Sequence, residues 1–414
     1  MTKDKEKRMT PEVRFKGFSG DWEQRKLGSE SKILTGGTPK TSIPEYWEPK
    51  KIPWMSSGEV NKRRLDGTDN MISEEGLNNS SARWVKKHSV LIALAGQGKT
   101  RGTVAVNNIQ LTTNQSIAAI VPNDNLYYEF IYQNLIKRYD ELRMISSGDG
   151  TRGGLNKQIV SDIVMPSPSR DEQYKIGTFF KQLDDTIALH QQKYDQLIQL
   201  KKAYLDLMFP KTGESTPQVR FADFHDNWEQ RKVFHYGEKT YGGGTPKTSI
   251  KEFWNGELPW IQSSDLSNHQ VYNVNVRKKI TSIGLEKSAA KLIPKNSIAI
   301  VTRVGVGKVA LIPFNYTTSQ DFLSLSNLKI NKWFAVYSLY KKMQKEVNTV
   351  QGTSIKGITK EELLQKNIRI PISVTEQSRI GNFLKSLDWT ITLHQKKIAS
   401  LKSLKQAYLQ KMFV

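Results

Sequence analysis

Apolar side chains recur at alternating steps of four and three over two long stretches of the chain, Glu172–Phe209 and Glu376–Phe413. This spacing is a heptad pattern, typical of helices that pack lengthwise against a partner. After Gly177 and Gly381, neither stretch contains Pro or Gly. At 1.5 Å per residue, each predicted helix is about 55 Å long. The seam positions are Ile176, Phe180, Leu183, Ile187, His190, Tyr194, Leu197, Lys201, Tyr204 and Met208, and then Ile380, Leu384, Leu387, Ile391, His394, Ile398, Leu401, Lys405, Tyr408 and Met412.

The starts of both helices carry capping signals. Ser169 and Thr375 are placed as N-caps, and Glu172 and Glu376 fall in the first turn. A side-chain hydroxyl satisfies a free amide there, and a carboxylate is favoured by the helix dipole.

The remainder of each half mixes strand-like and helical patterns. Runs rich in Ile, Val and Ala predict strands within Val90–Ala95, Gln115–Val121 and Ser297–Thr302. Apolar residues at helical spacing predict helices within Tyr127–Arg143 and Trp333–Val347. Each half is therefore predicted to hold an α+β domain.

Five groups of residues occur twice in the same order. Pro11–Lys26 matches Pro217–Lys232, and each copy is followed by an identical GGTPKTSI segment. The other repeated segments are Tyr46-Trp47 with Phe253-Trp254, Pro53-Trp54 with Pro259-Trp260, and Thr112–Gln115 with Thr317–Gln320. A period of about two hundred residues indicates a duplicated unit of one domain and one helix, since solenoid repeats are much shorter.

We therefore predict an α+β fold with two similar domains, each followed by a long helix. The predicted segments are residues 1–168 (first domain), 169–211 (first helix), 212–373 (second domain) and 374–414 (second helix). The middle segments of the two domains differ, notably Asn61–Met71 from Leu266–Lys279. Domains that match in their repeated segments and differ in their middle segments suggest two similar functions directed at two different ligands.

The charge balance points to a polyanionic ligand. The formal net charge is +22, from 62 Lys and Arg against 40 Asp and Glu. Nucleic acid is the leading candidate, and a membrane surface is the weaker alternative. No apolar run is long enough to cross a membrane. The absence of cysteine fits a reducing cytoplasm, and the six histidines show no metal-ligand spacing.

Motifs for catalysis are weak. Ala93–Thr100 ends like a Walker A loop, but Ala93 replaces its first Gly and a strand-like segment follows it instead of a helix. The chain has no Asn/Asp-Pro-Pro-Tyr/Phe tetrad for a flipped adenine and no Gly fingerprint for a methyl donor. We therefore expect no catalysis by this chain alone.

The duplicated segments together carry a family resemblance. They include the GGTPKTS openings, TTNQ and TTSQ, the Gly-rich SSGDGTRGGLNK and QGTSIKGITK segments, and the E-Q-x-x-I-G-x-F helix starts. With the LDDTIALHQQK and LDWTITLHQKK helix centres, the chain resembles the specificity subunit of type I restriction–modification enzymes over essentially its full length.

This resemblance implies two target recognition domains, each contacting one half of a bipartite double-stranded DNA site with a non-specific spacer. It also implies that the two long helices pack as an antiparallel coiled coil. It implies two methyltransferase (modification) subunits, and restriction (translocase/nuclease) subunits in the nuclease form of the complex. S-adenosylmethionine, ATP and Mg²⁺ would be bound by those partners, with no cofactor in this chain. Half-sites about 34 Å apart lie on one face of the duplex, a distance that helices of this length can span.

Antiparallel pairing of Glu172 with Met412 would place His190 opposite His394 at the centre of the helix pair. The alternative is that each histidine is a tolerated polar seam residue facing solvent. The seam lysines Lys201 and Lys405 are expected to extend outward, toward the recognition domains or the DNA.

Candidate DNA contacts divide by role. Residues shared by both halves should contact the phosphate backbone, and diverged polar residues should contact bases. The alternative for each is an ordinary solvated group. The phosphate candidates are Lys40, Thr41, Ser42, Lys99, Arg152, Asn156, Lys157, Lys247, Thr248, Ser249, Lys308, Lys356 and Lys360. The base candidates are Arg63, Arg64, Gln97, Arg101, Gln115, Gln262, Arg303 and Gln320.

Apolar positions outside the seams suggest a docking face for the methyltransferase subunits or packing against the recognition domains. They are Phe179, Leu189, Leu200, Leu205, Phe383, Leu393, Leu404 and Leu409. Two other functions stay open: a methyltransferase or nuclease with an unrecognised site, and a tandem-domain DNA-binding repressor.

Overall fold

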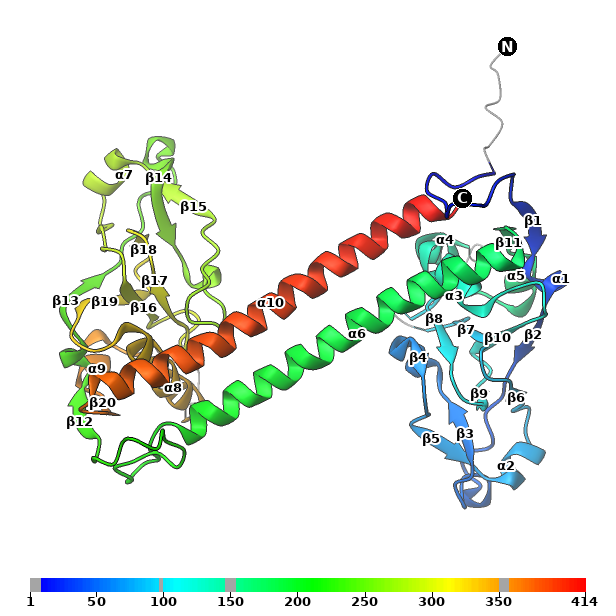
Figure 1. The fold of residues 1–414 in the computed structure, drawn as a ribbon, viewed down its shortest axis with the longest axis horizontal. Helices are drawn as coiled ribbons and strands as arrows, with labels where there is room; N and C mark the ends of the chain where they lie inside the picture. The colour runs from blue at the N-terminus through cyan, green and yellow to red at the C-terminus, as the bar shows by residue number, and fades with distance from the viewer. Residues whose placement is uncertain (1–8, 97–99, 146–153, 350–356) are drawn as a thin grey trace, which may run out of the picture. The chain divides into compact units, whose positions relative to one another are not determined.

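Both heptad stretches are continuous helices in the computed structural model of the protein, which describes residues 9–96, 100–145, 154–349 and 357–414. Helix α6 covers Arg170–Leu207 and helix α10 covers Val374–Met412 (Figure 1). Ser169 caps α6, because its hydroxyl accepts a hydrogen bond from the amide of Glu172 at 3.4 Å. The prediction for Thr375 is wrong. Helix α10 begins at Val374, so Thr375 lies inside it, and Ser373 caps it by accepting from the amide of Glu376 at 3.3 Å.

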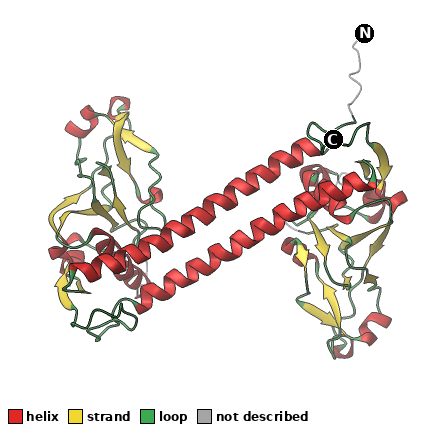
Figure 2. Ribbon diagram, viewed as in Figure 1, coloured by secondary structure: helices red, strands yellow, loops and turns green. Residues whose placement is uncertain are grey.

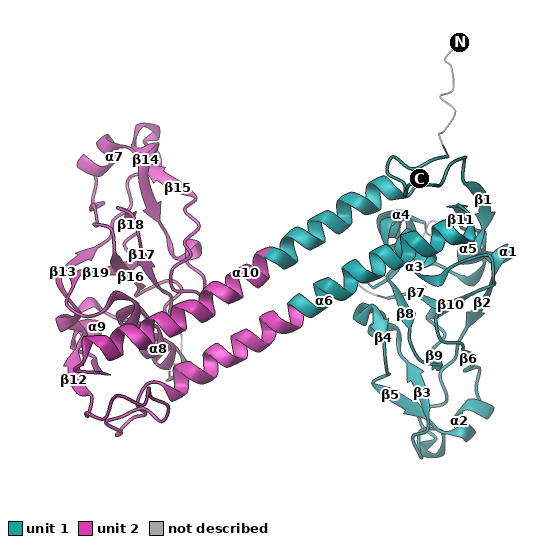
Figure 3. Cartoon of the chain, viewed as in Figure 1, with its two compact units in different colours: residues 1–190, 397–414 teal, residues 191–396 magenta. Residues whose placement is uncertain are grey.

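The chain forms two compact units, residues 1–190 with 397–414 and residues 191–396 (Figure 3). Each unit therefore contains one mixed domain of strands and short helices, together with a segment of each long helix (Figure 2). This grouping divides both long helices, whereas the segments predicted from the sequence keep each helix whole.

The described residues of the first unit form three sheets. The largest has the order β2-β10-β7-β8-β4, with antiparallel neighbours except for the parallel pair β4 and β8. A second has the order β5-β3-β9-β6, and β1 pairs with β11. The strands are β1 (Glu23–Lys26), β2 (Ser31–Thr35), β3 (Ile52–Met55), β4 (Arg64–Leu65), β5 (Asn70–Ile72), β6 (Trp84–Val85), β7 (Val90–Ala93), β8 (Val104–Asn107), β9 (Leu111–Thr113), β10 (Ile117–Pro122) and β11 (Val164–Ser167). The short helices are α1 (Leu27–Glu30), α2 (Glu74–Asn78), α3 (Tyr128–Lys137), α4 (Tyr139–Met144) and α5 (Lys157–Asp162).

The second unit repeats this plan. Its sheets have the orders β13-β19-β16-β17, β15-β14-β18 and β12-β20. The strands are β12 (Glu229–Lys232), β13 (Gly237–Gly242), β14 (Trp254–Ile261), β15 (Lys278–Ile280), β16 (Ser297–Val301), β17 (Val309–Ile312), β18 (Thr317–Thr318), β19 (Phe322–Leu328) and β20 (Asn367–Ile370). The short helices are α7 (Ser282–Glu286), α8 (Lys332–Thr349) and α9 (Lys360–Gln365).

The apolar runs form central strands buried on both faces. In β7, Val90 and Ile92 pack into one core with α3 and the long helices, while Leu91 and Ala93 pack into a second core on the other face. Such continuous apolar runs are expected where both faces of a sheet are covered. The predicted α+β class with two similar domains, each followed by a long helix, is confirmed.

Segments of the two long helices lie antiparallel within each unit. In the first unit Phe179 packs on Tyr408 with ring centroids 5.2 Å apart, and the later residue Asp184 contacts the earlier residue Lys405. In the second unit the rings of Tyr204 and Phe383 are 4.8 Å apart. The predicted opposition of His190 and His394 stays a prediction.

The E-Q-x-x-I-G-x-F motif fastens each long helix to its own domain. The buried carboxylate of Glu172 accepts two hydrogen bonds from Arg14, each 2.7 Å long, and Glu376 accepts the equivalent pair from Arg220 at 2.7 and 2.9 Å. This contact explains why the P-x-V-R-F segments recur with the motif. Gly381 lies so close to α8 that an added Cβ would be 2.6 Å from the amide nitrogen of Phe334.

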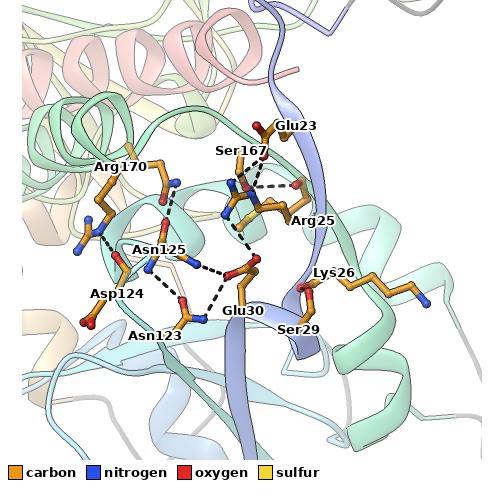
Figure 4. A network of polar contacts seen from close by, with 12 residues as sticks. Glu23, Arg25, Lys26, Ser29, Glu30, Asn123, Asp124, Asn125, Ser167 and Arg170 are labelled. Atoms are coloured by element: carbon orange, nitrogen blue, oxygen red, sulfur yellow. Dashed lines mark hydrogen bonds and ion pairs between the residues drawn. The ribbon is translucent and has the colours of Figure 1, made fainter.

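A polar network also holds the start of α6 in the first unit (Figure 4). The carboxylate of Glu30 accepts from Asn125 at 2.9 Å and Asn123 at 3.1 Å, and these bonds lower the pKa of Glu30. Arg170, at the first residue of α6, donates to the carbonyl of Asp124 at 2.9 Å. The loop before α3 thus connects the sheet to the long helix.

Candidate nucleic-acid interface

The repeated GGTPKTSI segment is a loop held in the same way in both units. In the first unit the amide of Gly37 donates to Thr113 at 2.9 Å, and the indole of Trp54 donates to the carbonyl of Gly37 at 2.9 Å. The indole of Trp47 donates to the carbonyl of Lys40 at 3.2 Å. The repeated tryptophans are therefore part of the scaffold of this loop.

The second unit reproduces these bonds. The amide of Gly244 donates to Thr318 at 2.9 Å, Trp260 donates to Gly244 at 3.0 Å, and Trp254 donates to Lys247 at 3.2 Å. A Cβ on Gly243 would lie 1.9 Å from the carbonyl of Ser319, so glycine is required by the close approach of two backbones.

The scaffold accounts for only part of the repeated segment. It explains the glycines, the buried Pro39 and Pro246, and the tryptophans. It leaves six exposed side chains without a structural reason to be identical: Lys40, Thr41, Ser42, Lys247, Thr248 and Ser249. Their exposure on a rigid, duplicated loop agrees with a contact common to both units.

The loop also meets the TTNQ and TTSQ segments. The hydroxyl of Thr38 donates to the side-chain oxygen of Gln115 at 2.7 Å, and Thr245 donates in the same way to Gln320. Gln115 and Gln320 are both exposed.

The segments that follow the Gly-rich runs SSGDGTRGG and QGTSIK bond to the end of a central strand, β7 in the first unit and β16 in the second. The amide of Leu155 donates to the carbonyl of Leu94 at 3.1 Å, and that of Ile358 donates to Thr302 at 2.8 Å. Lys157 and Lys360 are exposed at the first residues of α5 and α9. Asn156 caps α5 by accepting from the amide of Ile159 at 2.8 Å, so its side-chain oxygen serves the helix. Arg152 and Lys356 lie outside the described residues.

A cavity of about 790 Å³ in the second unit brings three of the candidates together. Arg303, Gln320 and Lys360 line it, from the turn after β16, the turn before β19 and the start of α9. Val304 also lines it and is 71% exposed.

Three of the remaining candidates make hydrogen bonds within the protein. Arg101 donates to the carbonyl of Arg143 at 2.9 Å, and Lys308 donates to that of Ser263 at 2.9 Å. Gln262 is half-buried, and its backbone amide donates to Asp265 at 3.0 Å. Gln97 and Lys99 lie outside the described residues.

Arg64 is a correction. We predicted a base contact, but its guanidinium lies 2.5 Å from the buried carboxylate of Glu129 and 3.3 Å from Asp184, and stacks over the ring of Tyr132. A cation in this network is unavailable to DNA. The neighbouring Arg63 is exposed, and one nitrogen donates to the carbonyl of Val104 at 3.2 Å.

Of the two directions predicted for the seam lysines, the structure shows the one toward the recognition domains. Lys201 donates to the carbonyl of His269 in the second domain at 2.7 Å. Lys405 lies 2.6 Å from Asp184, and Lys201 lies 2.6 Å from Asp388. Burial lowers the pKa of both ammonium groups. Each carboxylate also accepts from its own domain, Asp184 from Gln133 at 2.9 Å and Asp388 from Tyr337 at 2.7 Å. These duplicated junctions join both helices to a domain, and the sequence signal that could have located them is Asp184 and Asp388 at matching places in the two helices.

The predicted docking residues separate into two groups. Leu205 and Leu409 are buried in domain cores, and Phe179 and Phe383 are half-buried against those cores. For these four, packing against the domains replaces the predicted docking role. Exposed leucines remain at Leu189 (50%), Leu200 (42%), Leu393 (50%) and Leu404 (44%).

Three further features concern what the described residues lack. In place of the helix that a Walker A loop needs, β8 follows the turn after β7 and pairs with it antiparallel. Among the described residues, no group of three or more His, Cys, Asp or Glu side chains is placed to hold a metal ion. None of the helices in the described part of the chain combines the length and the apolar character needed to cross a membrane.

The comparisons with known proteins agree with this geometry. The model of the type I restriction modification DNA specificity domain matches the chain twice, at residues 19–199 and 225–403. The chain therefore belongs to the family of type I restriction–modification DNA specificity subunits, and the resemblance seen in the sequence is confirmed. Specificity subunits do not carry the catalytic activity of these systems, and a DNA-modifying enzyme or a repressor is not favoured.

One named relative matches most of the chain, and another matches about half of it. The MjaIX specificity subunit of the type I restriction enzyme from Methanocaldococcus jannaschii is 25% identical over 411 residues, covering 95% of this chain and 92% of that protein. The EcoR124I/EcoR124II specificity subunit from Escherichia coli is 26% identical over 196 residues, covering 46% of this chain and 48% of that protein. The crystal structure of the S subunit of a type I system from M. genitalium has a TM-score of 0.68 at 13% identity, covering 98% of this chain and 99% of that one, which shows a shared fold.

Proposed function

We propose that each unit contacts one half of a two-part double-stranded DNA site, and that the chain directs adenine methylation and restriction by partner subunits. The observation that supports this most strongly is the loop with identical exposed Lys, Thr and Ser side chains in both units, set among segments that differ. A shared contact with different surroundings suits two DNA sequences that share only their backbone.

The shared residues would contact phosphates. The backbone carbonyls of Lys40 and Lys247 each accept a hydrogen bond from a tryptophan, and both lysine side chains are exposed. Each ammonium group therefore extends from a fixed backbone position. Lys157 and Lys360 add a second cation near the same sheet end in each unit. Each charged phosphate contact releases counterions, which makes the binding salt-dependent.

The diverged residues would contact bases. Arg303 has the clearest setting, because it is exposed and lines the cavity beside the shared residues Gln320 and Lys360. Arg63, Arg101 and Gln262 are the remaining candidates in described positions. A bidentate contact between Arg and guanine contributes about 1–3 kcal/mol of discrimination.

The exposed leucines would bind modification subunits. Leu189 and Leu200 are eleven residues apart on α6, and Leu393 and Leu404 are eleven apart on α10, so each pair lies about three turns apart on one helix face. Two equivalent pairs suit two equivalent subunits. S-adenosylmethionine, ATP and Mg²⁺ would be bound by modification and restriction subunits rather than by this chain.

Reconstitution tests the proposal. The full chain would be combined with the modification subunits encoded by its own system, S-adenosylmethionine and a library of DNA, and methylated adenines would be mapped by sequencing. We expect one motif made of two defined parts separated by undefined bases, with no methylation when this chain is omitted. Methylation by this chain without modification subunits would contradict the assignment.

A further inference from the structure

The paired Thr and Gln side chains in each unit carry an additional inference about the proposed DNA site, and it rests on the proposed function. We infer that Gln115 and Gln320 donate a hydrogen bond from Nε2 to a DNA phosphate, while Thr38 and Thr245 hold the opposite side of each amide. The two glutamines are thereby backbone-contacting residues rather than base-contacting ones.

In each unit the glutamine amide is oriented with Oε1 toward the threonine hydroxyl. Thr38 Oγ1 donates to Gln115 Oε1 at 2.7 Å, and the second unit has the same bond between Thr245 and Gln320. A glutamine amide has one acceptor oxygen and two N–H donors. Within the described part of the chain, neither Nε2 has a hydrogen-bond acceptor, so each exposed amide directs only donors away from its threonine.

This orientation is poorly suited to adenine. A glutamine that recognises adenine accepts from N6 through Oε1 and donates to N7 through Nε2 at the same time. Here Oε1 is held by a threonine on a loop that is itself fixed by two tryptophans. An outward N–H₂ group matches a ligand with acceptors only. Phosphate oxygens are such a ligand, and so are O6 and N7 of guanine, so the choice between them rests on the duplication.

The duplication supports the same assignment. Both members of the pair recur in both units, whereas Arg303 and its surroundings do not recur. A residue kept in two domains with different base contacts serves a feature that all DNA shares. Gln320 also lines the cavity with Lys360, which supplies positive charge beside the neutral donor.

The isosteric change Gln115→Glu tests this most sharply. It retains an oxygen that can accept from Thr38 but replaces the outward N–H₂ group with a carboxylate oxygen, which would face a phosphate. On DNA carrying the mapped methylation motif, we expect Gln115→Ala to weaken binding of the full complex about ten-fold, the order of one hydrogen bond to a charged group. Gln115→Glu should weaken it further, about a hundred-fold or more. Gln320→Ala and Gln320→Glu should behave alike.

Two controls separate a phosphate contact from a bracing role. Replacing single phosphates with neutral methylphosphonates should identify one phosphate whose change weakens the wild type but not Gln115→Ala. The slope of binding against salt should stay unchanged in Gln115→Ala but fall by about one in Lys40→Ala, since only the lysine releases a counterion.

Wild-type DNA affinity in Gln115→Glu would overturn the inference. A residue whose only role is to accept a hydrogen bond from Thr38 would tolerate this change. A methylation motif altered at one base in Gln115→Ala would also overturn it, by showing base contact. Either result leaves the proposed function standing. That function fails instead if the wild type shows no preference for its motif.

Discussion

Arg63 and Arg64 are neighbours in sequence but differ in what surrounds them. The guanidinium of Arg64 neutralises Glu129, whose side chain is fully buried, and also contacts Asp184. Removing one partner of a buried ion pair leaves an uncompensated charge, at a cost of about 3–5 kcal/mol.

We therefore expect Arg64→Met to lower the free energy of unfolding by about 3–5 kcal/mol, measured by urea denaturation of the full chain. The matched variant Arg63→Met should change stability by less than about 1 kcal/mol, because its side chain is exposed. Equal stability of the two variants would contradict this view of Arg64.

Lys341 provides a pH-dependent prediction at the same scale. Its ammonium donates to the carbonyls of Asp206 at 3.1 Å and Phe209 at 3.4 Å, and burial lowers its pKa from 10.5 to about 8. Between pH 8 and 10.5 the unfolded chain therefore holds more protons at this group than the folded chain, and stability rises with pH.

Lys341→Met should remove this contribution, which a comparison of unfolding free energies at pH 8 and pH 10 would measure. Lys342→Met, one residue further on and with a more exposed side chain, is the matched control. An unchanged pH dependence in Lys341→Met would contradict the assignment.

At the scale of elements, the heptad spacing predicted α6 and α10 well, because a long helix repeats one physical pattern many times. The runs at Val90–Ala95 and Ser297–Thr302 predicted strands for a similar reason. The burial of Lys201 and Lys405 was not predictable, since their partners come from the other helix and from residues far away in sequence. Arg64 was missed for the same reason, because Glu129 and Asp184 lie in α3 and α6.

Helix α10 packs so closely on α8 at Gly381 that the position requires glycine. Alanine is favoured over glycine within a helix by about 1 kcal/mol. A Cβ at this position would nevertheless lie 2.6 Å from the amide nitrogen of Phe334 and 2.9 Å from the carbonyl carbon of Trp333, and a backbone cannot easily move away.

We expect Gly381→Ala to reduce the unfolding free energy by about 1–3 kcal/mol, as overpacking does. The exposed Ser400→Ala substitution on the same helix should be neutral or slightly stabilising. A gain in stability for Gly381→Ala in thermal unfolding would show that α10 and α8 separate without cost.

The exposed leucines give a prediction about assembly. Leu189→Asp combined with Leu393→Asp should abolish binding of modification subunits, because a carboxylate at the centre of an apolar contact loses its hydration. DNA binding by the chain alone should remain. The double variant Gln192→Asp with Ser400→Asp adds the same two charges at exposed positions of the same two helices. It should retain assembly, as judged by size-exclusion chromatography with light scattering. Loss of assembly in both variants would point to general charge repulsion.

At the scale of the whole molecule, the duplication is the central feature. Each unit has its own copy of the loop scaffold, the Thr–Gln pair and the buried Asp–Lys junction. The segments around Arg63 and Arg303 differ between the units. The repeated motifs in the sequence were enough to identify the family and the two domains. The distinction between residues that contact DNA and residues that fasten the fold required the structure, because arginine, glutamine and lysine serve both roles.

The most direct test of two independent DNA contacts is a methylation map of the reconstituted complex carrying Gln262→Ala and Arg303→Ala, both in the second unit. We predict relaxed base preference in only one part of the methylated motif, with the other part identical to that of the wild type. Relaxation of both parts, or a motif that is one continuous sequence, would contradict the account.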